Sequence, residues 1–123
     1  MDINKEFIKL KNIFRLLDWD IDLIQSSVLT SLACVYKSEN SYRAEINISS
    51  YLGDEEKLKG LIHELIHIVL RDTQDMARDA IKDDTLIKIY TKQMERETEK
   101  LTQIIFNLYW ENNNKLEEIE NVK

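Results

Sequence analysis

No proline occurs in this chain, and neither of its two glycines lies in the second half. Proline and glycine are the residues that most readily end a helix, so the apolar pattern from Asp54 to about residue 116 is predicted to be helical. A single helix of that length is too long for so small a domain, and a break is expected in the polar stretch between Arg71 and Thr85. The sequence therefore predicts one helix from about Asp54 to Leu70 and a second long helix after the break.

The first half of the chain combines one amphipathic segment with three short segments of another kind. Residues 3–17 carry apolar side chains at helical spacing, namely Ile3, Phe7, Leu10, Phe14 and Leu17. Three later segments have the alternation or β-branched composition of strands, centred near residues 22, 34 and 46. A polar turn is expected to join the second and third as a hairpin. The predicted fold class is α+β, with an N-terminal helix, a small three-stranded sheet and two later helices.

Length and charge restrict the kind of protein this chain can be. With 123 residues it is expected to form one domain over residues 1–123, with a polar tail at 110–123 that frays. Acidic residues outnumber basic ones 23 to 17 and give a net charge of −6. Nucleic-acid binding draws on clustered lysine and arginine, so no nucleic-acid partner is expected.

Secretion and membrane insertion are not expected either. Residues 1–14 contain no uninterrupted apolar run of the kind found in signal peptides, and no apolar run in the chain is long enough to span a bilayer. Cys34 is the only cysteine, so neither an intramolecular disulfide nor a cysteine metal cluster can form. A cytoplasmic protein with no membrane partner is predicted.

Residues 61–70, LIHELIHIVL, hold both histidines of the chain, four positions apart in an apolar helix. On an α-helix this spacing places His63 and His67 on one face, where both imidazoles can reach an ion about 2.0 to 2.1 Å away. Glu64 then lies beside the ion, where its carboxylate can accept a proton from a bound water. Histidines without partners would be costly to bury among these apolar residues. The HExxH pattern therefore predicts zinc ligands at His63 and His67 and a catalytic base at Glu64.

A catalytic zinc ion usually has three protein ligands and one open position. The chain has no third histidine and only one cysteine, so the third ligand is expected to be a carboxylate. Glu95, Glu97 and Glu99 in the C-terminal helix are the alternatives. Helical periodicity favours Glu97, which falls nearly in line with an apolar stripe formed by Tyr90, Met94, Leu101, Ile104 and Leu108.

HExxH followed by a glutamate on a later helix resembles the gluzincin metallopeptidases, whose third ligand is that glutamate. Their ligand helix tends to run as glutamate, a spacer, an apolar residue, a small residue, a polar residue and further apolar residues. The sequence EKLTQII, which begins at Glu99, follows this order, whereas starts at Glu97 or Glu95 do not. The resemblance implies Glu99 as third ligand, Thr102 as the small packing residue and Gln103 as a hydrogen-bond partner of a ligand histidine.

The order of elements is similar to that of small zincin-like domains from phages and mobile elements, including minigluzincins and ImmA/IrrE-type metallopeptidases. This resemblance covers about residues 19–110 and implies a zincin-like fold. It also implies that the strand YRAEINIS, residues 42–49, forms the exposed sheet edge that pairs with an extended peptide. No motif identifies an oxyanion-stabilising residue, for which Tyr51, Tyr90 and Tyr109 are the candidates.

These features predict a zinc metalloendopeptidase that acts on a peptide or protein substrate. In this hypothesis Zn²⁺ bound by His63, His67 and Glu99 lowers the pKa of a water molecule, and Glu64 accepts its proton. The rival hypothesis is a non-catalytic zinc-binding protein that serves as an interaction module of a phage or mobile element, since so short a domain can need metal for its stability. A water in the fourth zinc position would support the enzyme, and a fourth protein ligand the rival.

Overall fold

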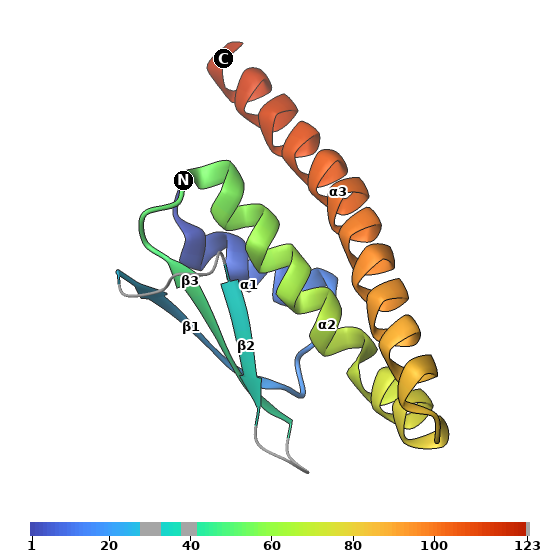
Figure 1. The fold of residues 1–123 in the computed structure, drawn as a ribbon. Helices are drawn as coiled ribbons and strands as arrows, with labels where there is room; N and C mark the ends of the chain where they lie inside the picture. Colours follow the sequence, from blue (N-terminus) through green and yellow to red (C-terminus); the bar gives the residue numbers. More distant parts are fainter. Residues whose placement is uncertain (28–32, 38–41, 123) are drawn as a thin grey trace.

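The computed structural model describes the backbone of residues 1–27, 33–37 and 42–122 and the side chains of residues 1–27 and 42–112. Its elements follow the chain in the order α1 (Ile3–Ile13), β1 (Asp20–Ser26), β2 (Ala33–Lys37), β3 (Arg43–Ser49), α2 (Asp54–Ala80) and α3 (Asp84–Val122). Figure 1 shows α2 and α3 side by side, with the sheet on the other side of α2. Helix α2, which carries the HExxH motif, therefore lies between α3 and the sheet.

The strands are ordered β1-β3-β2. Strands β1 and β3 run parallel, from Asp20 opposite Arg43 to Ser26 opposite Ser49, and β2 adds five residues antiparallel to β3. The turn predicted between β2 and β3 lies outside the described residues. The prediction that residues 42–49 form an exposed sheet edge is wrong, because β3 is paired on both sides and the edges belong to β1 and β2.

The predicted fold class also needs correction. The helices have 11, 27 and 39 residues, whereas the strands have only 7, 5 and 7. The molecule is therefore mostly helical, and among the described strands only β1 and β3 form a parallel pair. The predicted α+β zincin-like domain built around a small three-stranded sheet is therefore wrong, because the three helices make up most of the described structure. The physical reason is that no proline or glycine after Gly60 interrupts α2 or α3, so both helices run further than the domain's core requires.

Helix α1 is the amphipathic helix expected near the N-terminus, although it ends before residue 17. The side chain of Asp2 accepts a hydrogen bond from the backbone N–H of Asn4 and caps the start of the helix. Arg15 has φ 57°, a left-handed backbone conformation that a continuing α-helix cannot contain. The turn at Arg15 lets both Leu10 and Leu16 be buried in the core.

The hydrophobic core lies between the sheet, α1 and one side of α2. Helix α2 contributes four fully buried residues, Leu58, Leu61, Ile62 and Leu65. Strand β3, as the central strand, contributes Ile46 and Ile48, which are also fully buried. Burial of this much aliphatic surface fixes the position of α2 against the sheet and leaves its opposite side to face α3.

The break predicted between Arg71 and Thr85 is confirmed, since α2 ends at Ala80 and α3 begins at Asp84. The side chain of Asp83 accepts a hydrogen bond from the backbone N–H of Leu86 at 3.0 Å and so caps the start of α3. The helical backbone then continues to Val122, where the sequence predicted a frayed tail. Within the described part of the chain, no helix is both long and apolar enough to cross a membrane.

The side of α3 that meets α2 is not its apolar stripe. Three residues of that stripe are 41%, 56% and 59% exposed: Leu101, Ile104 and Leu108. Thr98 and Thr102 are buried instead, together with Phe106. The hydroxyl of Thr98 donates to the carbonyl of Met94 at 2.8 Å, and that of Thr102 donates to the carbonyl of Thr98 at 2.7 Å. These small side chains satisfy their own polar groups and let the two helices approach closely.

Candidate metal centre

His63 and His67 lie one turn apart on the side of α2 that faces α3. Their side chains are 17% and 22% exposed, and their ring centroids are 4.8 Å apart. The spacing of four residues brings the two rings together because a helical turn contains 3.6 residues. Helix α2 thus carries the hydrophobic core on one side and the two histidines on the other.

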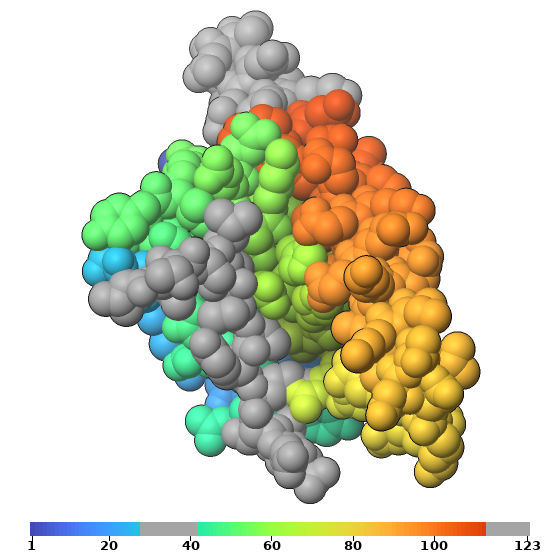
Figure 2. All heavy atoms as spheres, in the orientation of Figure 1, coloured from blue at the N-terminus to red at the C-terminus, as the bar shows by residue number. Residues whose placement is uncertain are grey.

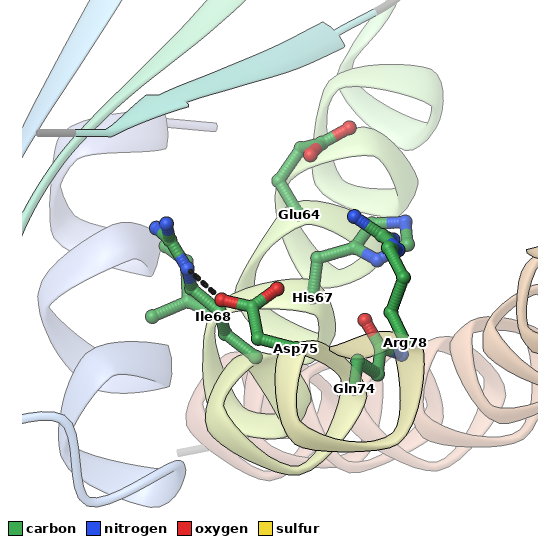
Figure 3. Close-up of a pocket in the computed structure, with 7 residues that line it drawn as sticks. Glu64, His67, Ile68, Gln74, Asp75 and Arg78 are labelled. Atoms are coloured by element: carbon green, nitrogen blue, oxygen red, sulfur yellow. Dashed lines mark hydrogen bonds and ion pairs between the residues drawn. The ribbon is translucent and has the colours of Figure 1, made fainter. Parts of the chain in front are cut away.

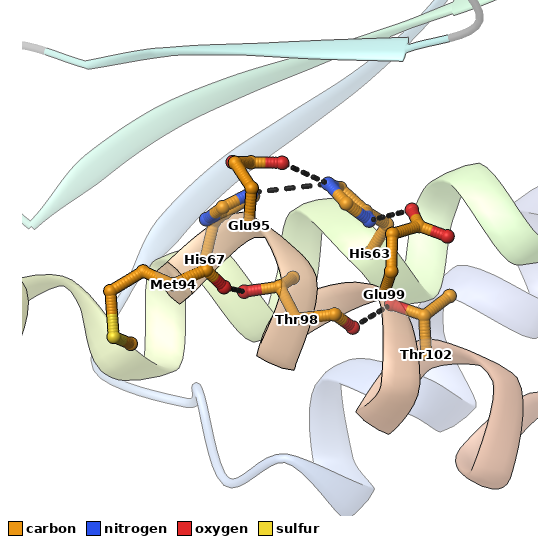
Figure 4. Close-up of polar contacts among 7 residues, drawn as sticks. All are labelled: His63, His67, Met94, Glu95, Thr98, Glu99 and Thr102. Carbon is orange, nitrogen blue, oxygen red and sulfur yellow. Dashed lines mark hydrogen bonds and ion pairs between the residues drawn. The ribbon is translucent and has the colours of Figure 1, made fainter. Parts of the chain in front are cut away.

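Glu95 of α3 reaches across to both histidines, as Figure 4 shows. Its Oε1 lies 2.9 Å from Nε2 of His67, and its Oε2 lies 3.6 Å from Nε2 of His63. The two Nε2 atoms are 3.1 Å apart. Ligand atoms of the three residues all lie within 4.8 Å of one another. The structure therefore groups the two predicted histidine ligands with Glu95.

The chemistry and spacing of these atoms suit a zinc ion. Two imidazole nitrogens and a carboxylate are a ligand set that catalytic zinc sites use. Two atoms bound about 2.0 to 2.1 Å from a tetrahedral zinc ion lie roughly 3.3 Å from each other. The distances among the Nε2 atoms and the nearest Glu95 oxygens run from 2.9 to 3.6 Å and bracket that value.

Glu99 lies one turn further along α3 and meets the other side of the His63 ring. Its Oε1 is 2.8 Å from Nδ1 of His63, although the approach lacks the angles of a hydrogen bond. A carboxylate at the second nitrogen of a metal-binding imidazole orients the ring and raises its basicity. The structure thus places Glu99 within hydrogen-bonding distance of Nδ1 of His63, the atom on which such a carboxylate acts, although the bond itself is not formed.

Glu97 and Gln103 make their polar contacts within α3. Glu97 accepts hydrogen bonds from Gln93 at 3.1 Å and from Lys100 at 3.3 Å. Gln103, predicted to bond a ligand histidine, donates instead to Asn107 at 3.3 Å. Glu97 is two residues from both Glu95 and Glu99, and on a helix this separation directs its side chain away from theirs.

The three tyrosines considered as oxyanion stabilisers are not found at the cluster. Tyr51 is 78% exposed in the turn before α2, and the hydroxyl of Tyr109 donates to Glu6 of α1. Tyr90 is not among the described residues that border the groove between α2 and α3 beside the histidines, and no other tyrosine is among them. The geometry assigns the role of oxyanion stabiliser to none of them.

Burial changes the titration of two groups at the site. Glu64 is only 8% exposed, and its burial raises the pKa of its carboxyl above the ordinary value of 4.5, with His63 opposing the shift and Glu95 adding to it. Burial also lowers the pKa of His67 below 6.5, with nearby Glu95 acting in the opposite direction. A carboxyl with a raised pKa can both accept and return a proton, and a neutral imidazole can bind a metal.

A groove of about 420 Å³ opens beside the cluster between α2 and α3, whose outer surfaces are seen side by side in Figure 2. It is bordered by His63 and Glu64 from α2 and by Glu95 and Glu99 from α3. Gly60, one turn before Glu64, also borders the groove and adds no side chain to fill it. The side chains of Glu95 and Glu99 are 55% and 69% exposed, so the cluster is accessible from solvent. The volume lies within the range of pockets that bind small ligands.

Comparisons of this chain with protein-family models, with curated proteins and with solved structures found no match. The resemblance to gluzincins therefore rests on the sequence alone: the HExxH motif, the later glutamates with the residues that follow them, and the order of elements. The cluster, the buried Glu64 and the groove are the structural features that bear on the function of this protein.

Proposed function

We propose that this protein is a zinc-dependent metallopeptidase that hydrolyses peptide bonds. The observation that carries the proposal is the convergence of His63, His67 and Glu95 within 4.8 Å, with Glu64 buried beside them at a groove open to solvent. These are the parts that HExxH peptidases combine: two imidazoles, a carboxylate ligand and a free carboxylate as base. Glu95 takes the place of Glu99 as the proposed third ligand, because its two oxygens face both Nε2 atoms.

Each residue of the site has a distinct task in this proposal. His63, His67 and Glu95 hold the metal, and Glu99 orients the His63 ring through Nδ1. A zinc ion bound there supplies Lewis acidity toward a water molecule and a peptide carbonyl. The Glu64 carboxylate accepts one proton from the attacking water and later returns it to the nitrogen of the departing amine. The raised pKa of Glu64 suits it to both transfers.

A non-catalytic zinc-binding protein that acts as an interaction module is the second candidate. The observation in its favour is Glu99, whose carboxylate already lies 2.8 Å from the His63 ring. If the Glu99 carboxylate moved from Nδ1 to the Nε2 side of that ring, it would become a fourth protein ligand and close the site, as in structural zinc centres. The number of protein ligands on the metal thus separates the two candidates.

The test combines metal analysis with hydrolysis of a broad peptide library by wild type and Glu64→Gln. About one zinc per chain is expected in both proteins, because the amide keeps the shape of the carboxyl and Glu64 is not a ligand. Hydrolysis is expected from wild type only, since loss of a general base typically costs about a hundredfold to ten-thousandfold in rate. Wild-type protein that binds zinc but cleaves no peptide would favour the second candidate, and protein that binds no zinc would reject both.

A further inference from the structure

A second pocket, of about 450 Å³, adjoins the candidate site further toward the C-terminal end of α2 (Figure 3). Glu64 and His67 border it at one end, and Arg71, Gln74, Asp75 and Arg78 border the rest. Apart from the adjacent Gln74 and Asp75, successive members of this set are three or four residues apart, so they continue along one face of α2. The extension of α2 beyond Leu70 thus lines a pocket that begins at the proposed metal site.

Two nitrogen atoms in the wall of this pocket are buried donors without an acceptor among the described residues: Nη1 of Arg71 and Nε2 of Gln74. The orientation of the Arg71 guanidinium is fixed, because its Nε donates to Asp75 at 3.0 Å. Leaving buried N–H groups unbonded is unfavourable, so such atoms are normally found with a partner. A bound acceptor would satisfy them if the side chains that now cover these two nitrogens moved aside.

The charge of the wall indicates which acceptor fits. Arg71 and Arg78 place two guanidinium groups at the border of this pocket in a protein whose net charge is −6, and Asp75 is already engaged by Arg71. The planar fork of a guanidinium matches the two oxygens of a carboxylate. A singly charged carboxylate is favoured over a doubly charged phosphate, because Glu64 and Asp75 also border the pocket and would repel the second charge.

We propose that this pocket binds a carboxylate of the peptide substrate next to the bond to be cleaved, through Arg71, Gln74 and Arg78. The inference rests on the proposed peptidase function and names its substrate class: peptides with an acidic side chain or a free C-terminal carboxylate near the cleaved bond. Both sources present the same group to the same donors. The protein would therefore prefer peptides with an acidic side chain or a free C-terminus near the cleaved bond over peptides that lack such a carboxylate.

The test measures how the full-length zinc-loaded protein binds and cleaves three sets of peptides. The sets are amidated peptides with an internal glutamate, neutral peptides with a free C-terminus, and amidated peptides with glutamine in place of glutamate. Calorimetry is expected to show tighter binding, by about tenfold to a hundredfold, for at least one carboxylate set than for the glutamine set. The preferred set identifies the source of the carboxylate. Equal binding of all three sets would overturn the inference.

Arg71→Gln and Arg78→Gln are each expected to remove most of this preference while keeping the zinc content and the unfolding temperature. Arg96→Gln, an exposed residue of α3, is the matched control and should keep the preference. If peptides are hydrolysed without regard to carboxylates, this inference fails and the peptidase proposal stands. If carboxylate peptides bind through Arg71 and Arg78 but none is cleaved, the pocket is a binding site and the peptidase proposal fails.

Discussion

Nδ1 of His63 lies 2.8 Å from an oxygen of Glu99, on the side of the imidazole ring opposite the Nε2 atom that faces His67. The His63 ring thus lies between His67 and Glu95 on one side and the Glu99 carboxylate on the other. Glu95 and Glu99, four residues apart on α3, therefore meet different atoms and are expected to have different tasks. One would bind the ion, and the other would hold a ligand in position.

Glu95→Ala is expected to weaken zinc binding far more than Glu97→Ala. Glu95 contacts both histidines, whereas Glu97 accepts hydrogen bonds from Gln93 and Lys100 of its own helix, and such exposed contacts contribute little. Competition with a chromophoric chelator measures the two zinc affinities. A larger loss for Glu97→Ala would show that the sequence periodicity, rather than the structure, had identified the ligand.

Glu99→Gln is expected to lower zinc affinity about tenfold to a hundredfold, the usual effect of removing a carboxylate that orients a ligand histidine. His63→Ala, which removes the ligand itself, should abolish most of the binding. The same chelator competition compares the two variants. Equal losses would mean that Glu99 binds the metal directly.

The raised pKa of Glu64 predicts a pH-dependent stability of the metal-free protein. Below about pH 4.5 the carboxyl is protonated in the folded and unfolded states, and its contribution to stability is fully present. As the pH rises through the raised pKa of the folded state, the unfolded state releases its proton more readily and this contribution is lost. Urea unfolding in the presence of a chelator should therefore show a smaller loss of stability between pH 4.5 and neutrality in Glu64→Gln than in wild type. Parallel pH profiles for the two proteins would contradict the burial of this carboxyl.

Leu61→Ala is expected to lower the free energy of unfolding by about 2 to 5 kcal/mol, because it opens a cavity where α2 packs in the core. Leu61 is fully buried, whereas Leu108 of α3 is 59% exposed. Leu108→Ala should change the unfolding free energy by no more than about 0.5 kcal/mol. Denaturant unfolding of the zinc-loaded proteins measures both values. A similar loss in the two variants would contradict the described core.

The features of the structure that could be predicted from the sequence are those determined by residues close together in the chain. The positions of the three strands, the break after α2 and the placement of His63 and His67 on one helical face all follow from residues within a few positions of one another. The order of the strands in the sheet does not follow from such local patterns. An alternating segment specifies which of its residues are buried but not its neighbours, so the central position of β3 could not be derived from YRAEINIS.

The choice among the three glutamates shows the same limit. Periodicity favoured Glu97 on the assumption that the apolar stripe of α3 faces α2, yet Leu101 and Ile104 of that stripe are exposed. The helix meets α2 through Thr98 and Thr102, whose small size permits close approach but gives no hydrophobic signal. Glu95 precedes Thr98 by three residues and Thr102 by seven, and this helical spacing was the available sign that it shares their face.

The central claim is that His63, His67 and Glu95 together bind zinc. A crystal structure of the zinc-loaded protein, with anomalous diffraction recorded at the zinc absorption edge, tests it most directly. The predicted result is one zinc ion per chain, bound by Nε2 of both histidines and by the Glu95 carboxylate, with a water in the fourth position and Glu99 beside Nδ1 of His63. A zinc ion bound by Glu99 in place of Glu95, or no zinc at the histidines, would contradict the account.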